Sequence, residues 1–269
     1  MTGASGFQLR AGGPASYERY NAVFMAPLVA ALLERSGLGT GGALLDLACG
    51  PGLIARAAAA IVGPQGRLDG VDVNGPMIAH ARAASSGTVP SITYHEAPAE
   101  ALPLADAEFD AVLCQQGMQF FTDLDAAVAE CARVLRPGGR LAATVWSALE
   151  ESPYMQAHSL ALARLEGPEE GAAVAAPFSF PPERLTAAFE QAGLRNVAVE
   201  RVSPEVELPA LEEFAPGHFA GVPWGRRTSA DPVQTAKAVA LMKEHLRRWT
   251  RPDGRVVVPF SSVLVSGVR

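Results

Sequence analysis

The chain has 269 residues, of which 49% are hydrophobic and 19% are charged. This composition is typical of a folded globular protein with one or two domains, and it excludes a disordered chain. The 22 basic and 28 acidic residues give a net charge of −6. An acidic balance argues against a protein that binds phosphate backbones or anionic lipid surfaces.

The cysteines and the apolar runs indicate the cellular compartment and whether the chain enters a membrane. The three cysteines have no Cys-x-x-Cys spacing, so we expect neither a disulfide framework nor a zinc site, and a reducing compartment such as the cytoplasm. No apolar run reaches the roughly 18 residues that a membrane span needs, so we expect no membrane insertion. Residues 1–14 are rich in Gly, Ala and Ser without an apolar stretch, which predicts a flexible N-terminus and no signal peptide.

Short apolar runs alternate with helical patterns over the first half of the chain. A helical pattern covers residues 15–36, and Pro27 is expected to break it into two pieces. Strands are expected at residues 43–48, 67–73, 91–95, 109–115 and 140–146. The helices expected between them cover residues 53–62 and 76–84, followed by one that begins near residue 122 and ends in a tight turn at 136–139. This alternation predicts an α/β fold with a doubly wound, mostly parallel sheet.

The pattern changes after residue 146. Helices are expected at residues 153–165, 182–192 and 231–250, with a connector rich in Pro and Ala at 167–182. Residues 195–207 and 255–268 alternate as strands do. We expect these to be two closing strands of the same sheet, with helical insertions over its C-terminal edge.

A glycine turn after the first expected strand marks the place where a ligand would bind. Gly50 and Gly52 lie in this turn, and Asp72 ends the next strand, 20 residues after Gly52. In open α/β sheets, ligands bind beyond the carboxyl ends of the strands, and an acid at this position can accept hydrogen bonds from ribose hydroxyls. The two features predict a ligand that contains a nucleoside.

The glycine turn alone does not determine which nucleoside-containing ligand binds. Residues 50–55 satisfy G-x-G-x-x-A, the relaxed dinucleotide pattern, so an NAD(P)-dependent oxidoreductase is one alternative. Asp46 lies inside the first strand, where an acid suits a cationic ligand. The only lysines are Lys237 and Lys243, so the Tyr-x-x-x-Lys pair of many hydride-transfer enzymes is absent.

Five sequence strings occur in the order and spacing of one known family. They cover residues 44–52, 70–77, 99–104, 109–112 and 135–139, and they resemble motifs of the class I S-adenosylmethionine-dependent methyltransferases, UbiE-like (type 11/25) small-molecule branch. The resemblance covers about residues 17–146. It implies a Rossmann-like sheet of seven strands with the last strand antiparallel, and an enzyme that transfers a methyl group to a small organic acceptor.

The resemblance also implies the residues that bind S-adenosylmethionine. Asp46 would lie near the ammonium group, Asp72 would hold the ribose, and Val73 and Met77 would flank the adenine. Because no break in composition indicates a second domain, we expect a single domain at residues 15–269, with a cofactor-binding core at 15–147 and substrate-covering insertions plus the closing strands at 148–269. The full predicted cofactor set is Tyr20, Asp46, Ala48, Gly50, Gly52, Asp72, Val73, Met77, Ala99, Glu100, Cys114, Gln115 and Gln119.

Two residues depart from the family pattern. Ala48 stands where the family has its first glycine, and Pro98 stands where it commonly has an aspartate that reaches the adenine amine. Adenine recognition would then fall to the Ala99 amide or to water. These departures favour a third alternative, a partner subunit that keeps the fold without turnover.

The residues around the acceptor are open to two interpretations. Tyr17, Tyr20 and Phe24 form a helical stripe that either packs on the sheet or contacts the acceptor. His158 and His218 lie in the insertions, where each is either a catalytic base or a structural residue. Trp146 and Trp224 are candidates to cover an aromatic acceptor.

Partners are predicted only by class. The segment after the fourth strand reads Cys-Gln-Gln-Gly at residues 114–117, without the Asn/Asp-Pro-Pro-aromatic string that grips a flipped base. We therefore expect a small-molecule acceptor and no nucleic acid. The atom that is methylated (oxygen, nitrogen or carbon) and the oligomeric state are not determined by the sequence.

Overall fold

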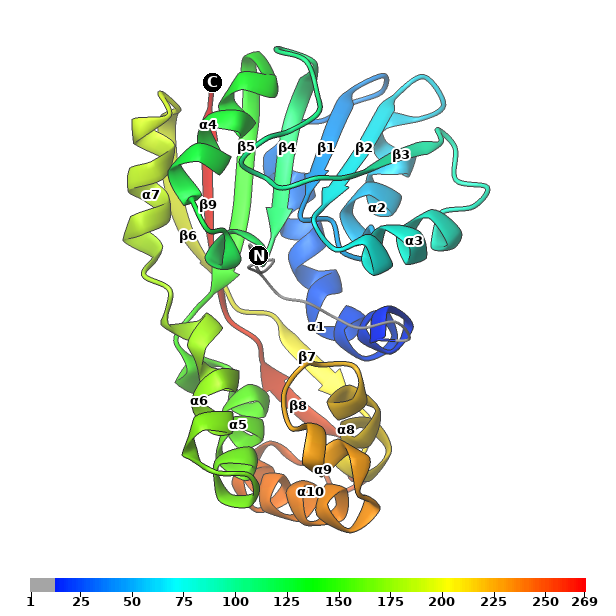
Figure 1. The fold of residues 1–269 in the computed structure, drawn as a ribbon, viewed down its shortest axis with the longest axis vertical. Coiled ribbons are helices and arrows are strands. Elements are labelled where there is room, and N and C mark those ends of the chain that lie inside the picture. The colour runs from blue at the N-terminus through cyan, green and yellow to red at the C-terminus, as the bar shows by residue number, and fades with distance from the viewer. Residues whose placement is uncertain (1–12) are drawn as a thin grey trace, which may run out of the picture.

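The computed structural model describes residues 13–269 (Figure 1). The predicted flexible N-terminus lies outside this range, apart from Gly13 and Pro14, which begin the first helix. The strands are β1 (Ala43–Leu47), β2 (Arg67–Asp72), β3 (Ile92–Glu96), β4 (Phe109–Gln115), β5 (Leu135–Trp146), β6 (Arg195–Val202), β7 (Glu205–Leu208), β8 (Val256–Pro259) and β9 (Ser262–Val268).

Ten α-helices and four 3₁₀ turns connect these strands within the described residues. The α-helices are α1 (Gly13–Ser36), α2 (Leu53–Val62), α3 (Gly75–Ala84), α4 (Leu124–Val134), α5 (Pro153–Leu165), α6 (Pro168–Ala175), α7 (Pro182–Gln191), α8 (Leu211–Ala220), α9 (Arg226–Ala230) and α10 (Pro232–Leu246). The 3₁₀ turns are η1 (Met118–Phe120), η2 (Leu149–Glu151), η3 (Ala176–Ser179) and η4 (Arg247–Trp249).

The main sheet has seven strands in the order β3-β2-β1-β4-β5-β9-β6. β1 to β5 pair in parallel, whereas β9 is antiparallel to both β5 and β6. The predicted doubly wound sheet with an antiparallel last strand is thus confirmed. The strand order reverses between β1 and β4, so their carboxyl ends form the point where such sheets bind ligands.

Helices cover both faces of this sheet (Figure 1). On one face, Val29 and Leu32 of α1 and Ile54 of α2 pack on Leu44 of β1. On the other face, residues of α4 and α7 form a separate core with alternate residues of the same strands, Leu45 among them. Because β1 is covered on both sides, all five of its residues are buried, whereas the edge strand β3 is buried only at Tyr94.

A second, smaller unit lies beyond the carboxyl ends of the strands (Figure 1). It contains α5, α6, α8, α9, α10 and a two-stranded sheet of β7 and β8. The prediction of two unbroken closing strands was therefore wrong in part: β6 and β9 complete the main sheet, but the chain leaves that sheet near residues 203–204 and 260–261. We call residues 147–181 together with 203–261 the cap.

Local predictions failed where packing overrides sequence signals. α1 continues through Pro27, because the neighbouring Phe24 and Leu28 are fully buried and their packing offsets a cost of about 3 kcal/mol for the proline. The predicted connector at residues 167–182 contains α6 and η3. The expected turn at 136–139 is present as an irregularity within β5, since Phe109 pairs with Leu135 and Ala111 with Arg140.

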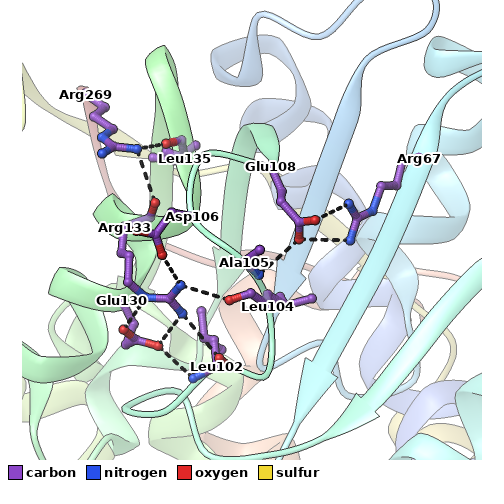
Figure 2. Close-up of polar contacts among 10 residues, drawn as sticks. All are labelled: Arg67, Leu102, Leu104, Ala105, Asp106, Glu108, Glu130, Arg133, Leu135 and Arg269. Carbon is purple, nitrogen blue, oxygen red and sulfur yellow. Dashed lines mark hydrogen bonds and ion pairs between the residues drawn. The ribbon is translucent and has the colours of Figure 1, made fainter.

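An arginine network fixes the long loop between β3 and β4 (Figure 2). Arg133 of α4 donates to the carbonyl oxygens of Leu104 at 2.8 Å and Leu102 at 3.2 Å, and it pairs with Asp106 and Glu130. Glu130 accepts the backbone N–H of Leu102 at 2.8 Å. The loop therefore has a defined course as it passes the carboxyl end of the sheet.

Within the described residues, no helix combines the length and apolar composition needed to cross a bilayer.

The packing of the cap can be tested on α5, which has one buried leucine and one exposed leucine. Leu162 is 0% exposed and Leu160 is 52% exposed. We expect Leu162→Ala to lower the free energy of unfolding by about 2–5 kcal/mol, because it leaves a cavity, and Leu160→Ala to change it by less than about 0.5 kcal/mol. Urea unfolding followed by circular dichroism measures both values. Equal losses would contradict this packing.

Candidate functional site

The turn between β1 and α2 has an unusual backbone. Ala48, Gly50 and Gly52 all adopt left-handed φ angles, of 52°, 50° and 79°. A Cβ atom at Gly52 would lie 2.3 Å from the hydroxyl oxygen of Tyr94, so this position admits only glycine without rearrangement. The turn therefore presents backbone groups, with few side-chain atoms, at the point where the strand order reverses.

Asp72 joins this turn to the next one. Its carboxylate accepts the backbone N–H groups of Gly50 and Asn74, each at 2.8 Å. Burial raises the pKa of Asp72, and the hydrogen bonds from the backbone oppose this shift. Each carboxylate oxygen has a second lone pair, so the side chain can accept further hydrogen bonds from a ligand.

Asp46 lies deeper in the same region, 2% exposed on β1. It accepts the backbone N–H of Ala55 at 3.0 Å, and no basic side chain forms an ion pair with it among the described residues. Burial raises the pKa of Asp46 well above its ordinary value. A buried acid with so little compensation is a favourable neighbour for a cationic group.

A cavity of about 530 Å³ opens at these residues, within the range of small-molecule sites. One wall consists of the loops at the carboxyl ends of the strands. The other comes from the cap and α1 and is mostly apolar. The apolar side includes Met25, Trp146, Met155, Phe178, Val222, Trp224 and Phe260.

Charge is distributed unevenly in this cavity. Its lining contains four acids: Asp46 on β1, Asp72 at the end of β2, and Glu100 and Asp123 in the loops that follow β3 and β4. None of the described lining residues is Lys, Arg or His. The cavity therefore has an acidic wall and an uncharged, largely apolar wall, and it suits a ligand with a cationic part next to an apolar space.

Most residues of the predicted cofactor set line the cavity. Those that do are Asp46, Ala48, Gly50, Asp72, Val73, Met77, Ala99, Glu100 and Gln115. Tyr20, Gly52, Cys114 and Gln119 are not among the lining residues. Cys114 is fully buried beneath the site, and Tyr20 instead makes an edge-to-face contact with Phe214 of the cap, with ring centroids 5.7 Å apart.

Two of the predicted residues already have protein partners. Glu100 accepts the backbone N–H groups of Thr122 at 3.1 Å and Asp123 at 3.3 Å, so it shapes the loop before α4. The Gln115 amide donates to the carbonyl oxygen of Met25 at 2.7 Å and holds α1 against the end of β4. Both interactions build the cavity wall.

Several lining residues were not in the predicted set. Tyr17 lines the cavity, and burial together with the charge of Asp72 raises its pKa to about 12. Asn21 follows one helical turn later. Gln116 has a strained φ of 54° and donates to Ser262 at 2.8 Å. The four-residue spacing of Tyr17, Asn21 and Met25 was a signal that could have identified this face of α1.

The two predicted histidines lie away from the cavity. His158 and His218 are 0% and 1% exposed, and neither lines the cavity. Their ring centroids are 5.5 Å apart, and His158 stacks on Phe219 at 4.7 Å. The structure thus places both in the core of the cap, and this position does not support a role as catalytic base. No cluster of three or more potential metal ligands occurs in residues 13–269.

The strand order and the ligand-binding edge define a class of protein. A seven-stranded sheet of this topology, with the glycine turn and Asp72 at its switch point, is that of the class I, Rossmann-like methyltransferases. Residues 45–143 match the family model described as a methyltransferase domain. This matched stretch includes all four acids of the cavity lining.

Known proteins are similar to this chain in sequence over part of its length and in fold over more of it. The ubiquinone/menaquinone biosynthesis C-methyltransferase UbiE of Hahella chejuensis is 39% identical over 111 residues, which are 40% of this chain and 45% of that protein. The chain thus aligns with less than half the length of the curated relatives it matches.

Solved structures share the fold over more of the chain. A SAM-dependent methyltransferase from Aquifex aeolicus is 19% identical with a TM-score of 0.53, covering 72% of this chain and 92% of that one. Phosphoethanolamine N-methyltransferase 2 of Haemonchus contortus, solved with phosphomonomethylethanolamine and S-adenosylhomocysteine, is 18% identical with a TM-score of 0.58. It covers 97% of this chain and 60% of that one.

Burial of the cap histidines leads to a pH dependence of stability. Burial lowers the pKa of His158 from 6.5 to about 3, and that of His218 in the same direction. Below pH 6.5 the unfolded chain binds protons that the folded chain does not, so the free energy of unfolding should fall by up to about 1.4 kcal/mol per pH unit for each histidine.

The variant His158→Phe isolates this effect, because a phenylalanine can keep the stacking on Phe219. Urea unfolding at pH 7.5, 6, 5 and 4.5 should give a shallower loss of stability for the variant than for the wild type. Identical slopes for the two proteins would show that His158 is not held neutral by the fold.

Proposed function

We propose that the protein is a S-adenosylmethionine-dependent methyltransferase that acts on a small organic acceptor. The observation that carries this proposal is the combination of a glycine turn with the buried Asp46 and the half-buried Asp72 on one wall of a cavity whose other wall is apolar. The methyltransferase domain match and the class I fold support it.

The residues on the acidic wall fit the cofactor. Asp72 has free lone pairs for two ribose hydroxyls, and the apolar Val73, Met77 and Pro98 can flank the adenine. Asp46 would attract the positive charge of the methionine part, and this attraction would offset the cost of burying its carboxylate. Pro98 offers no hydrogen bond, so the Ala99 amide is the nearest donor or acceptor for adenine in this loop.

The bound cofactor would supply an activated methyl group for in-line displacement. The protein's own contribution is then alignment and exclusion of water. The acceptor side offers the neutral amides of Asn21 and Gln116 and apolar side chains, and its lining within residues 13–269 contains no histidine or lysine. We therefore propose that the acceptor needs little or no help from a general base on that wall.

The alternatives fit the same cavity less well. An NAD(P)-dependent oxidoreductase would place pyrophosphate against the acidic wall, where the described lining offers no basic side chain. A nucleic-acid acceptor would meet the same repulsion. The partner-subunit alternative rested on Ala48 and Pro98, and both lie in the wall of a cavity that is formed. These points favour turnover on a small molecule.

We also propose that residues 15–269 act as one domain, in which the substrate-covering part belongs to the same unit as the core. β9 and β6 of the C-terminal half complete the sheet that the N-terminal half begins, which supports this division into core and cap. The cytoplasm remains our proposal for its location.

Binding of S-adenosylhomocysteine measured by titration calorimetry tests the proposed function. We expect saturable binding to the wild type and a loss of about 10- to 100-fold in affinity for Asp72→Asn, because the amide cannot accept hydrogen bonds on both sides as the carboxylate does. The exposed Asp106→Asn is the matched control and should bind as the wild type does. No binding to the wild type would refute the proposal.

A tritiated-methyl transfer assay then tests turnover. If the wild type binds the cofactor but labels no acceptor from a panel of phenols, amines and activated carbon acids, the partner-subunit alternative gains support.

A further inference from the structure

Glu18 joins three helices at one point. Its side chain, on the second turn of α1, pairs with Arg56 of α2 through one carboxylate oxygen. The other carboxylate oxygen lies 2.5 Å from Nε2 of His80 on α3. The three side chains are only 22–25% exposed, so water and salt screen these contacts less than they would at an open surface. We call these three residues the Glu18 cluster.

The fold stabilises the charged form of this carboxylate. Burial acts to raise the pKa of Glu18, but hydrogen bonds from His80 and Arg56 and the charges of these two side chains lower it below its ordinary value. A lowered pKa means that the neighbours favour the ionised carboxylate over the neutral acid. The contacts of Glu18 are therefore charge-assisted hydrogen bonds, which are stronger than those between neutral groups.

Each helix of the Glu18 cluster continues into a part of the acidic wall. Tyr17, the residue before Glu18, lines the cavity. Arg56 donates from Nε to the carbonyl oxygen of Gly52 in the glycine turn at 3.3 Å. Met77, on the first turn of α3, also lines the cavity. One carboxylate outside the cavity thus connects three segments that surround the proposed cofactor position.

The cap holds the opposite side of the first turns of α1. Figure 1 shows these turns between α3 and the cap helix α8. Tyr20 meets Phe214 of α8 edge to face, and a Cβ atom at Gly217 would lie only 1.9 Å from the Tyr20 ring. Packing therefore attaches these turns to the cap, and the Glu18 cluster attaches them to the cofactor side of the molecule.

The first half of α1 can move separately from the second half. Pro27 lies in the middle of the helix and has no N–H group, so one backbone hydrogen bond between the two halves is missing. Val29 and Leu32, after the proline, are buried against the sheet. Loss of the Glu18 cluster would therefore release the first turns and leave the second half in place.

We infer that Glu18 is a positioning residue that keeps the first turns of α1 closed on the cofactor wall, so that the Glu18 cluster controls how fast the cofactor leaves. The inference rests on the proposed function, because the acidic wall is taken to hold S-adenosylmethionine. Glu18 itself does not line the cavity. It acts through the placement of Tyr17 and Arg56 and takes no part in methyl transfer.

Hydrogen–deuterium exchange of the ligand-free protein measures the attachment of α1 directly. We expect amides of residues 13–24 to exchange about tenfold faster in Glu18→Ala than in the wild type, because the variant lacks the contacts with α2 and α3. Glu200→Ala is the matched control. Glu200 pairs with Arg35 in the last turn of the same helix, so its loss should leave exchange of residues 13–24 unchanged.

Stopped-flow kinetics of S-adenosylhomocysteine measures the consequence for the site, with the fluorescence of Trp146 and Trp224 in the cavity lining as the signal. We expect release from Glu18→Ala to be about tenfold faster than from the wild type and association to be unchanged or faster. A distorted cofactor wall would instead slow association. Release from the wild type should also accelerate between 0.05 and 0.5 M NaCl, because salt screens ion pairs, and this acceleration should be smaller for Glu18→Ala.

The outcomes distinguish this inference from the proposed function. If S-adenosylhomocysteine does not bind the wild type, both fail. If it binds, but exchange and release in Glu18→Ala equal those of the wild type, or association slows while release is unchanged, only the inference is overturned. Urea unfolding verifies that each variant is folded. Glu18→Gln, which keeps the shape of the side chain without its charge, should change release in the same direction and replaces the alanine variant if that one does not fold.

Discussion

The carboxylate of Asp72 holds together the part of the molecule on which the site depends. By accepting the backbone N–H of Gly50 from the turn after β1 and that of Asn74 from the turn after β2, it joins two loops that are distant in the chain. Asp72 and the glycine turn whose amide it binds therefore shape the acidic wall of the cavity.

Two sources of side chains give the cavity its two walls. The loops of the parallel sheet contribute acids. A carboxylate with little solvent exposure is stable only when hydrogen bonds from backbone N–H groups or a nearby cation compensate its negative charge. The cap contributes aromatic and aliphatic residues, which pack in one cluster with α1. α1 joins the two, because its first half borders the cavity and the cap, and its second half packs on the sheet.

The cofactor half of the molecule was predictable from the sequence because its signals are local. Short strands rich in apolar residues, glycine turns and a terminal acid each act within a few residues, and β4 and α2 match their predicted bounds. The position of Asp46 and Asp72 in one cavity follows directly from parallel strand pairing. Their individual roles as ligand contacts remain predictions.

The cap was less predictable because its structure depends on distant contacts. His158 and His218 looked like candidate bases, since nothing in the neighbouring sequence shows that both would be enclosed by aromatic rings from α5 and α8. The splitting of each closing strand into two pieces also has no local cause: β7 and β8 leave the sheet as a pair, and only their mutual pairing makes this possible. Asn21 was hidden within a helix that reads as ordinary core.

The continuity of β6 with β7 and of β8 with β9 has a consequence for how such a protein can diversify. Residues 205–259 are inserted as one excursion between two adjacent antiparallel strands, whose own pairing does not depend on the length of the inserted segment. Residues in this excursion can therefore change, and reshape the acceptor space, while β1 to β5 and their turns stay intact. The match to the methyltransferase-domain model ends at residue 143, before this segment begins, whereas Val222 and Trp224 of the segment line the same cavity as the matched loops.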